Sequence, residues 1–282
     1  ACLLPIQKHG TAVQKEKFLP ALCDGRWIAS NAMTEQSAGS DVFQMSSTAQ
    51  ATTDGFLLNG HKTYASNAPL ADIVLGYALT NPEKGFFGGV SAFILEHDQQ
   101  HFRASLPIAK TGLISCQLGE IFLEDVAVAN TSLLGQTGAG GQIFNQSMDW
   151  ERICLSALHL GTMERLLKRA VKFARRRKSG GQSISKSQAV SHPLAALHCR
   201  IAAGRQLLWQ AAWKLDQGQK VQLEAAMVKL SISETYRDFG LQLVQLYAGA
   251  AYKAGHEAEV CLRDALAATI YSGTSEVQKN II

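Results

Sequence analysis

Long apolar runs are missing from this sequence. No stretch approaches the roughly 20 consecutive apolar residues of a membrane-spanning helix, which argues against a helical membrane protein. The N-terminus shows no basic region followed by an apolar segment and a small-residue cleavage site, so nothing there indicates a secretory signal peptide. We therefore expect a cytoplasmic protein without a membrane partner.

Metal-binding spacings are missing as well. The six cysteines form no CxxC pair with one another and no CxxH pair with any of the eight histidines. We therefore expect no metal site. Several cysteines have apolar neighbours, and we expect buried thiols in a reducing compartment rather than disulfides.

Neither charge sign is in large excess. The chain has 27 Lys and Arg against 23 Asp and Glu, a formal net charge of +4. This small excess does not indicate a nucleic-acid partner, although it is compatible with an acidic macromolecular partner. With 282 residues, 46% hydrophobic and 18% charged, the composition is that of a globular chain with a sizeable core in one or two domains.

Three kinds of pattern follow one another along the chain. Residues 1–28 predict helix, with Gly25 as its stop. Residues 29–134 hold short strand-like runs between turn clusters and no helix-length periodic segment, which favours an antiparallel barrel or sandwich. Residues 135–282 begin with the Gly-rich joint "GQTGAGGQ" and continue as long amphipathic helices, which predict a bundle.

Two segments in the strand-rich part could bind a planar cofactor. In "NAMTEQSAGSDV", a strand runs into a turn whose exposed N–H groups and hydroxyls suit a flavin edge or a pyrophosphate. In "NGHKTYASNAPLADI", strand alternation puts Tyr64 and Ser66 on one face. Taken alone, each segment is equally compatible with an ordinary loop or a half-buried strand.

Five segments, in order along almost the whole chain, resemble the acyl-CoA dehydrogenase family. They are "PIQKHGTAVQKEKFLPALCDG", "AMTEQSAGSDV", "LNGHKTYASNA", "MDWERICLSALHLG" and "LRDALAATIYSGTSEVQ". The resemblance implies an α+β fold with three parts: the end of an N-terminal helical domain (1–28), a middle antiparallel β-barrel domain (29–134) and a C-terminal four-helix bundle (135–282). It also implies FAD as cofactor and a homotetramer.

The resemblance assigns flavin contacts to three groups of residues. The middle domain would supply Met33, Thr34, Gly39, Ser40, Tyr64 and Ser66. The closing signature would supply Thr274 and Glu276. A neighbouring subunit would contact the FAD through Arg177, Gln188, Gln245 and Gly249.

One of these contacts, Arg177, has independent support, whereas the nearby position 180 departs from the family. Arg177 lies in the cation-rich segment "RRRKSGG", where an arginine fork suits a pyrophosphate, although such a cluster also complements a helix dipole. The family usually has Phe at the position of Gly180. We therefore expect weaker stacking on the cofactor there.

The family reaction needs a carboxylate that removes the α-proton of a thioester while a hydride goes to the flavin. Many members carry this glutamate just before Gly-Thr of the closing signature, where this chain has Ser272. A minority place it on the bundle helix before an arginine, which matches Glu151-Arg152. We predict Glu151 as the base, with Arg152 and Ser272 beside the substrate. The alternative is a glutamate at a helix N-terminus paired with Arg152.

The serine at 272 and four segments, "HKTYASNAPLADI", "SMDWERICL", "QAVSHPLA" and "IYSGTSEVQ", resemble one branch of the family. That branch oxidises prolyl groups carried on a peptidyl carrier protein by a phosphopantetheine thioester. The resemblance implies a dihydropyrrole or, after two rounds, a pyrrole-2-carboxyl thioester. Either oxygen or an electron-transfer flavoprotein would reoxidise the flavin.

Two other functions remain open from the sequence. The chain could be a short- or branched-chain acyl-CoA dehydrogenase with its base on the bundle helix. It could also be a non-catalytic flavin-binding relative that holds DNA, but the modest charge of +4 argues against that function.

Overall fold

The computed structural model describes residues 2–282, which divide into two compact units. The sheet unit comprises residues up to Lys110 together with Ile114–Met148, and the helical unit comprises Thr111–Leu113 together with Asp149–Ile282. Each unit has an apolar core of its own.

The sheet unit begins with two helices, α1 (Leu3–His9) and α2 (Ala12–Cys23). A capping box starts α2, because the Thr11 side chain accepts from the backbone of Gln14 and the Gln14 side chain accepts from the backbone of Thr11. After α2 the chain turns at Gly25, whose φ is +76°. The predicted helical segment and its stop are therefore confirmed.

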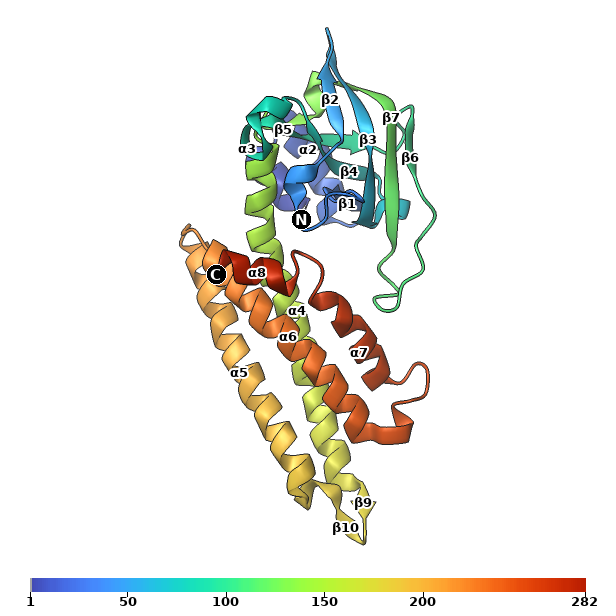
Figure 1. The fold of residues 1–282 in the computed structure, drawn as a ribbon, viewed down its shortest axis with the longest axis vertical. Coiled ribbons are helices and arrows are strands. Elements are labelled where there is room, and N and C mark those ends of the chain that lie inside the picture. Colours follow the sequence, from blue (N-terminus) through green and yellow to red (C-terminus); the bar gives the residue numbers. More distant parts are fainter. Residues whose placement is uncertain (1) are drawn as a thin grey trace. The chain divides into compact units, whose positions relative to one another are not determined.

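An eight-stranded sheet forms the rest of this unit (Figure 1). Its hydrogen-bonded order is β6-β7-β3-β2-β4-β5-β8, and β1 pairs with β4. The strands are β1 (Ala29–Ala32), β2 (Thr48–Ala51), β3 (Gly55–Ser66), β4 (Ile73–Leu79), β5 (Val90–Glu96), β6 (Phe102–Ala104), β7 (Leu118–Ala129) and β8 (Leu133–Leu134). The short helix α3 (Phe86–Gly89) precedes β5.

The sheet is mixed, which corrects the prediction of a wholly antiparallel one. β4 runs parallel to both β1 and β2, whereas the other pairs in this sheet are antiparallel. Apolar alternation along a strand indicates which side chains are buried, but it carries no information about the direction of the neighbouring strand. The sequence patterns therefore predicted the strands and not their pairing.

The central strands are buried on both faces, as their continuous apolar runs indicate. In β4, Val74 and Ala78 belong to one core, whereas Ile73, Leu75 and Tyr77 belong to the other. The second core also contains side chains of α1 and α2, so these helices cover one face of the sheet.

Four helices contribute side chains to the apolar core of the helical unit (Figure 1). They are α4 (Gly140–Arg176), α5 (Gln188–Asp216), α6 (Gln222–Tyr247) and α7 (Glu257–Ala268), and a shorter helix α8 (Ser275–Ile281) ends the unit. A hairpin of β9 (Lys178–Ser179) and β10 (Gln182–Ser183) follows α4. Its turn residues Gly180 and Gly181 have φ of +57° and +81°, a conformation that glycine adopts without strain.

The remaining regular elements are short, and no helix among residues 2–282 is long and apolar enough to cross a membrane. Contrary to expectation, Cys23, Cys116 and Cys199 are exposed, although Cys261 is buried. The 3₁₀ helices are η1 (Val42–Gln44), η2 (Ala68–Leu70), η3 (Pro82–Lys84), η4 (Asn130–Ser132), η5 (Ile184–Lys186) and η6 (Ala248–Ala250).

Candidate functional site

The predicted flavin-binding turn lies between β1 and β2 of the sheet unit. Met33 is buried, and the carbonyl of Thr34 accepts from the backbone N–H of Thr63 at 2.9 Å. Beyond the turn, Gly39 and Ser40 are exposed. A Cβ added at Gly39 would meet no atom within 4 Å, so a ligand can approach the backbone closely here.

The predicted pair Tyr64 and Ser66 is exposed on one face of β3, while Ala65 between them is buried. Tyr64 is 64% exposed and has a φ of +52°, which is rare for a residue with a side chain. The register of β3 against β7 shifts between Lys62 and Ala65, so a bulge redirects the tyrosine. Such local strain is typical of ligand-binding sites.

A buried ion pair between Glu35 and Lys62 joins these two segments and was not predicted from the sequence. Lys62 Nζ lies 2.7 Å from Glu35 Oε1, and both side chains are almost fully buried. The backbone N–H groups and hydroxyls of Ser46 and Ser47 also donate to the Glu35 carboxylate. No sequence signal marked this pair, because each residue by itself resembles an ordinary surface charge.

The pKa values of this pair follow from burial and mutual attraction. Burial raises the pKa of Glu35, but Lys62 and the serine hydrogen bonds outweigh it and hold that pKa well below its usual range. Burial also lowers the pKa of Lys62, and Glu35 opposes this effect. The ion pair therefore stays charged at neutral pH.

The exposed groups of the sheet unit fit the FAD that the fold family implies. Tyr64 offers an exposed aromatic face, Ser66 an exposed hydroxyl and Gly39 an open stretch of backbone. An aromatic face, a hydroxyl donor and unobstructed N–H groups are what a planar, hydrogen-bonding ring system requires.

In the helical unit, Glu151 lies in the interior of α4 and is hydrogen-bonded to Ser272. The Ser272 hydroxyl donates to Glu151 Oε1 at 2.5 Å, and Ser272 has a φ of +54°. Arg152 pairs with Asp149 at 3.4 Å and donates to the carbonyl of Ser272 at 3.1 Å. The alternative of a helix N-terminal glutamate paired with Arg152 is wrong, since α4 begins at Gly140 and the partner of Arg152 is Asp149.

Gln278 holds the segment that carries Ser272. Its buried side-chain amide donates to the carbonyls of Ser272 at 3.2 Å and of Gly273 at 2.8 Å. Gly273 has a φ of +87°, and a Cβ there would approach the Gln278 amide nitrogen to 2.7 Å. Thr274 then caps α8 by accepting from the backbone of Val277. This role of Gln278 was not predicted.

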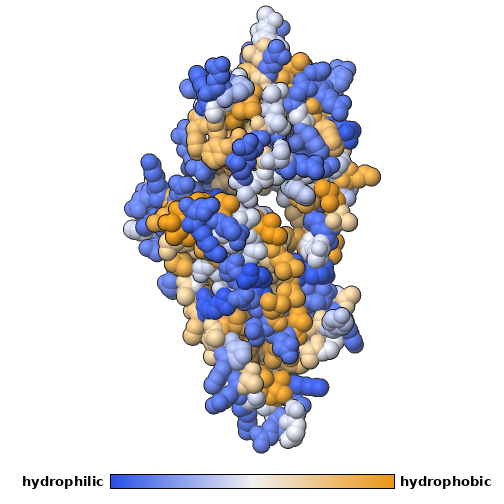
Figure 2. Space-filling view, viewed as in Figure 1, coloured by the Kyte–Doolittle hydropathy of each residue, from blue (hydrophilic) through white to orange (hydrophobic). Residues whose placement is uncertain are grey.

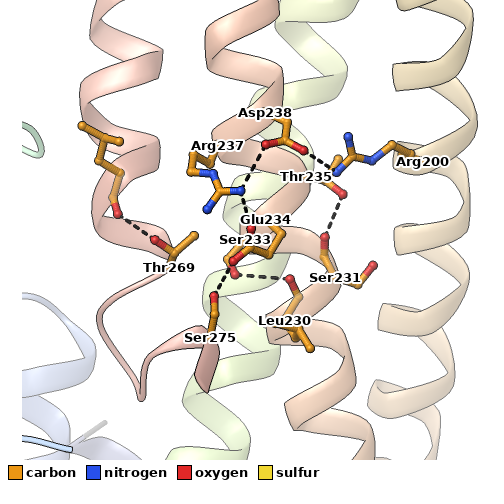
Figure 3. Close-up of polar contacts among 11 residues, drawn as sticks. Arg200, Leu230, Ser231, Ser233, Glu234, Thr235, Arg237, Asp238, Thr269 and Ser275 are labelled. Atoms are coloured by element: carbon orange, nitrogen blue, oxygen red, sulfur yellow. Dashed lines mark hydrogen bonds and ion pairs between the residues drawn. The ribbon is translucent and has the colours of Figure 1, made fainter. Parts of the chain in front are cut away.

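A charged network anchors the start of α8 to α6 and α5 (Figure 3). The Ser275 hydroxyl donates to Glu234 at 2.5 Å, and Arg237 pairs with Glu234 at 2.6 Å. Asp238 links Arg237 to Arg200, at 3.3 Å and 3.0 Å. Arg200, Glu234 and Arg237 border an open pocket of about 660 Å³, which the predicted flavin contact Glu276 also lines.

His159 lies about two helical turns beyond Glu151 on α4, and it was not predicted from the sequence. Its Nε2 is 2.5 Å from the hydroxyl of Tyr271, and its ring stacks on Tyr236 at 5.0 Å. Burial, with a further contribution from the Lys229 cation, lowers the pKa of His159 to about 4. Burial and the nearby Arg152 lower the pKa of Lys229 to about 8, although acidic neighbours oppose the effect. The sequence signal that could have identified His159 and Lys229 was a polar side chain on a mostly apolar helix face.

The neutral state of His159 predicts a loss of stability in acid. Its folded pKa of about 4 is below the ordinary value of 6.5, so the unfolded chain binds an extra proton between these pH values. The contribution is complete above pH 6.5 and is lost as the pH falls towards 4, by roughly 1–3 kcal/mol. We expect His159→Phe, which keeps a ring against Tyr236, to flatten the dependence of the unfolding free energy on pH in this range.

Chemical denaturation at a series of pH values measures this slope. The matched control is His198→Phe at an exposed position of α5. An unchanged slope in His159→Phe would contradict the assignment.

The residues predicted to bind a neighbouring subunit's FAD gather at the other end of the helical unit, by β9 and β10 (Figure 1). Arg177 follows α4, and Gln188 is the first residue of α5, whose N-terminus has no side-chain cap. Gln245 and Gly249 lie at the end of α6 and in η6. The α4 and α6 ends meet there, since the rings of Phe173 and Tyr247 are 4.5 Å apart. Exposed Arg177 and the uncapped N–H groups suit an anion.

Comparison with known proteins places most of the chain in one family. Residues 30–126 match the family described as acyl-CoA dehydrogenase, middle domain. Residues 138–282 match acyl-CoA dehydrogenase, C-terminal domain.

Similar proteins of known activity and structure span the whole chain. The chain is 43% identical to an L-prolyl-[peptidyl-carrier protein] dehydrogenase of Pseudomonas fluorescens, over 100% of this chain and 74% of the relative. A Serratia protein of the same name is 40% identical, over 100% of this chain and 73% of the relative. The solved structure "PigA with FAD and proline" matches 100% of this chain and 73% of its own, at 39% identity and a TM-score of 0.98. The chain therefore belongs to the acyl-CoA dehydrogenase family of FAD-dependent oxidoreductases.

Proposed function

We propose that this protein oxidises a prolyl group held as a phosphopantetheine thioester on a peptidyl carrier protein. The observation that carries the proposal is the Ser272–Glu151 hydrogen bond of 2.5 Å. The closing loop carries a hydroxyl, and a carboxylate on α4 reaches it. The carboxylate that acts as the base therefore comes from the helix. The relatives that are named for this reaction and are 43% and 40% identical support the substrate.

Glu151 acts as the base of the proposed reaction. Its carboxylate removes the α-proton of the prolyl thioester, which the thioester carbonyl makes acidic. Ser272 orients the carboxylate through its hydroxyl, and the carbonyl of Ser272 is held by Arg152 of α4 and Gln278 of α8. FAD, when bound, accepts the hydride that leaves the substrate in the same oxidation. One proton and one hydride are removed, and one double bond forms.

Several residues of each unit are proposed as flavin contacts. From the sheet unit we propose Met33, Thr34, Gly39, Ser40, Tyr64 and Ser66, and from the start of α8 Thr274 and Glu276. The supporting observations are the exposed Tyr64 and Ser66 on one strand face and the open backbone at Gly39.

We propose a homo-oligomer, because one FAD cannot reach both predicted contact regions of a single helical unit. The family resemblance implies that this oligomer is a homotetramer. An α-helix rises about 1.5 Å per residue, so Glu151 and Arg176 at opposite ends of this part of α4 lie roughly 38 Å apart. That is longer than an extended dinucleotide. Arg177, Gln188, Gln245 and Gly249 would therefore serve the cofactor of a neighbouring subunit.

Exposed apolar side chains on α5 and α6 support the same assembly. Trp209 and Trp213 are one turn apart on α5 and are 60% and 59% exposed. Leu223 and Leu241 on α6 are 46% and 53% exposed. Figure 2 shows hydrophobic residues in orange among polar ones on the visible face of the helical unit. Large exposed aromatic groups of this kind are typical of subunit interfaces.

Further features of the proposal follow from the family. The sheet would act as the middle β-barrel domain (29–134) and α4 to α7 as the C-terminal four-helix bundle (135–282), with residues 1–28 as the end of an N-terminal helical domain. We also predict that either oxygen or an electron-transfer flavoprotein reoxidises the flavin, and that the protein is cytoplasmic.

The substrate class can be tested directly. We expect purified protein loaded with FAD to bleach its flavin with L-prolyl-carrier protein, and to react much more slowly with short or branched acyl-CoA thioesters. The rates are measured under single-turnover conditions. Preference for acyl-CoA would favour the ordinary dehydrogenase of the same family, and no reaction with either substrate would contradict the proposal.

A further inference from the structure

The buried pair Glu35 and Lys62 connects three segments of the sheet unit. Lys62 on β3 donates to Glu35 Oε1 at 2.7 Å and lies 3.4 Å from the carbonyl of Met33. Both oxygens of the Glu35 carboxylate accept from the segment that precedes β2, at 2.5–3.0 Å from Ser46 and Ser47. The two side chains therefore connect the end of β1, the start of β2 and the middle of β3.

The pair is adjacent in sequence to residues that would contact the flavin. Met33 and Thr34 come directly before Glu35, and Tyr64 and Ser66 follow Lys62. A backbone hydrogen bond of 2.9 Å from Thr63 to Thr34 joins the same two segments. The bulge of β3 lies between Lys62 and Ala65, so the ion pair fixes the backbone on the side where Tyr64 leaves the regular strand.

Stability alone does not account for such a pair. Removing two charges from water is unfavourable, and well-packed apolar side chains of similar volume stabilise a core at least as well. An ion pair adds geometric specificity, because its charged hydrogen bonds form only when the segments that it joins lie in one arrangement.

We propose that Glu35 and Lys62 are positioning residues for the flavin. They hold the Met33–Thr34 segment against β3 so that Tyr64 and Ser66 present a preformed surface to the cofactor. This inference rests on the proposed function for the location of the flavin. It adds that the geometry of that surface depends on a buried charge pair that does not touch the cofactor.

The test compares the double variant Glu35→Gln/Lys62→Met with the wild-type protein. The variant removes both charges together and leaves no unpaired carboxylate in the core. We expect the apoprotein to fold, with a far-ultraviolet circular dichroism spectrum like that of the wild type. FAD affinity should fall by about 10-fold or more, because small displacements of a preformed site are costly, and the flavin absorbance bands should broaden.

The matched control is Lys17→Met/Glu96→Gln, which removes an exposed ion pair of the same unit with the same 2.7 Å separation. We expect FAD affinity and the flavin spectrum of this control to equal those of the wild type. If the control lost affinity equally, a general effect of lost charge would explain the result and the positioning role would be overturned.

A second variant covers the case in which the double variant does not fold. Glu35→Asp keeps the charge and shortens the side chain by one methylene. We expect a folded protein that binds FAD more weakly and reaches normal turnover when excess FAD is added. Wild-type affinity and spectrum in every folded variant would overturn the inference while leaving the proposed function intact. Failure of the wild-type protein to bind FAD would overturn both.

Discussion

Replacement of Glu151 by glutamine is expected to lower the rate of flavin bleaching by prolyl-carrier protein about 10²–10⁴-fold. Glutamine has nearly the same shape, and its side-chain oxygen can still accept from the Ser272 hydroxyl, which lies 2.5 Å from Glu151 in the structure. It cannot take a proton from the substrate, so only the chemical step is removed. Stopped-flow absorbance measures the rate, and the FAD spectrum in the absence of substrate should remain that of the wild type.

A glutamate on the same helix provides the control for Glu151. Glu164 pairs with Arg205, and its side chain is 32% exposed. We expect Glu164→Gln to bind FAD and bleach it at the wild-type rate. Wild-type turnover by Glu151→Gln would show that the carboxylate of α4 is not the base.

The double variant Trp209→Glu/Trp213→Glu is expected to dissociate the homo-oligomer. In the proposed assembly these half-exposed indoles would be buried, and an unpaired carboxylate in their place would cost about 3–5 kcal/mol. Because Arg177 and Gln188 would then have no neighbouring cofactor to contact, FAD affinity should fall along with the oligomer size. Analytical ultracentrifugation and FAD titration measure the two effects together.

The control for this variant is Val13→Glu on α2, at a residue that is 73% exposed. It introduces a carboxylate at an exposed position of the other unit and should leave the assembly and FAD affinity unchanged. A double tryptophan variant that remained a tetramer would contradict the proposed interface, whereas a smaller species with full FAD affinity would contradict the role of the neighbouring subunit.

Local patterns in the sequence were sufficient for the order and type of the elements. The helix-length periodic segments became α4 to α7, and the strand-like run at residues 73–79 became β4. These features depend on side chains a few residues apart, whose spacing determines which of them share a face. For the same reason Tyr64 and Ser66 could be placed together on β3.

Which strands pair in the sheet, and in which direction, could not be predicted from such patterns. That β4 runs parallel to β1 depends on how the chain crosses over between them, and alternation within a strand does not encode it. The ion pair of Glu35 and Lys62 joins residues 27 positions apart, and each residue by itself resembled an ordinary surface charge.

By itself the sequence determined which segments are strands and helices, and its resemblance to the family marked the positions of Glu151 and Ser272 as the two places where the catalytic carboxylate could lie. Only the tertiary structure decided that these residues, 121 positions apart, form one hydrogen-bonded pair. Periodicity acts over a few residues, whereas a contact between distant side chains exists only after the helices have packed and a left-handed turn has directed the Ser272 hydroxyl to its partner.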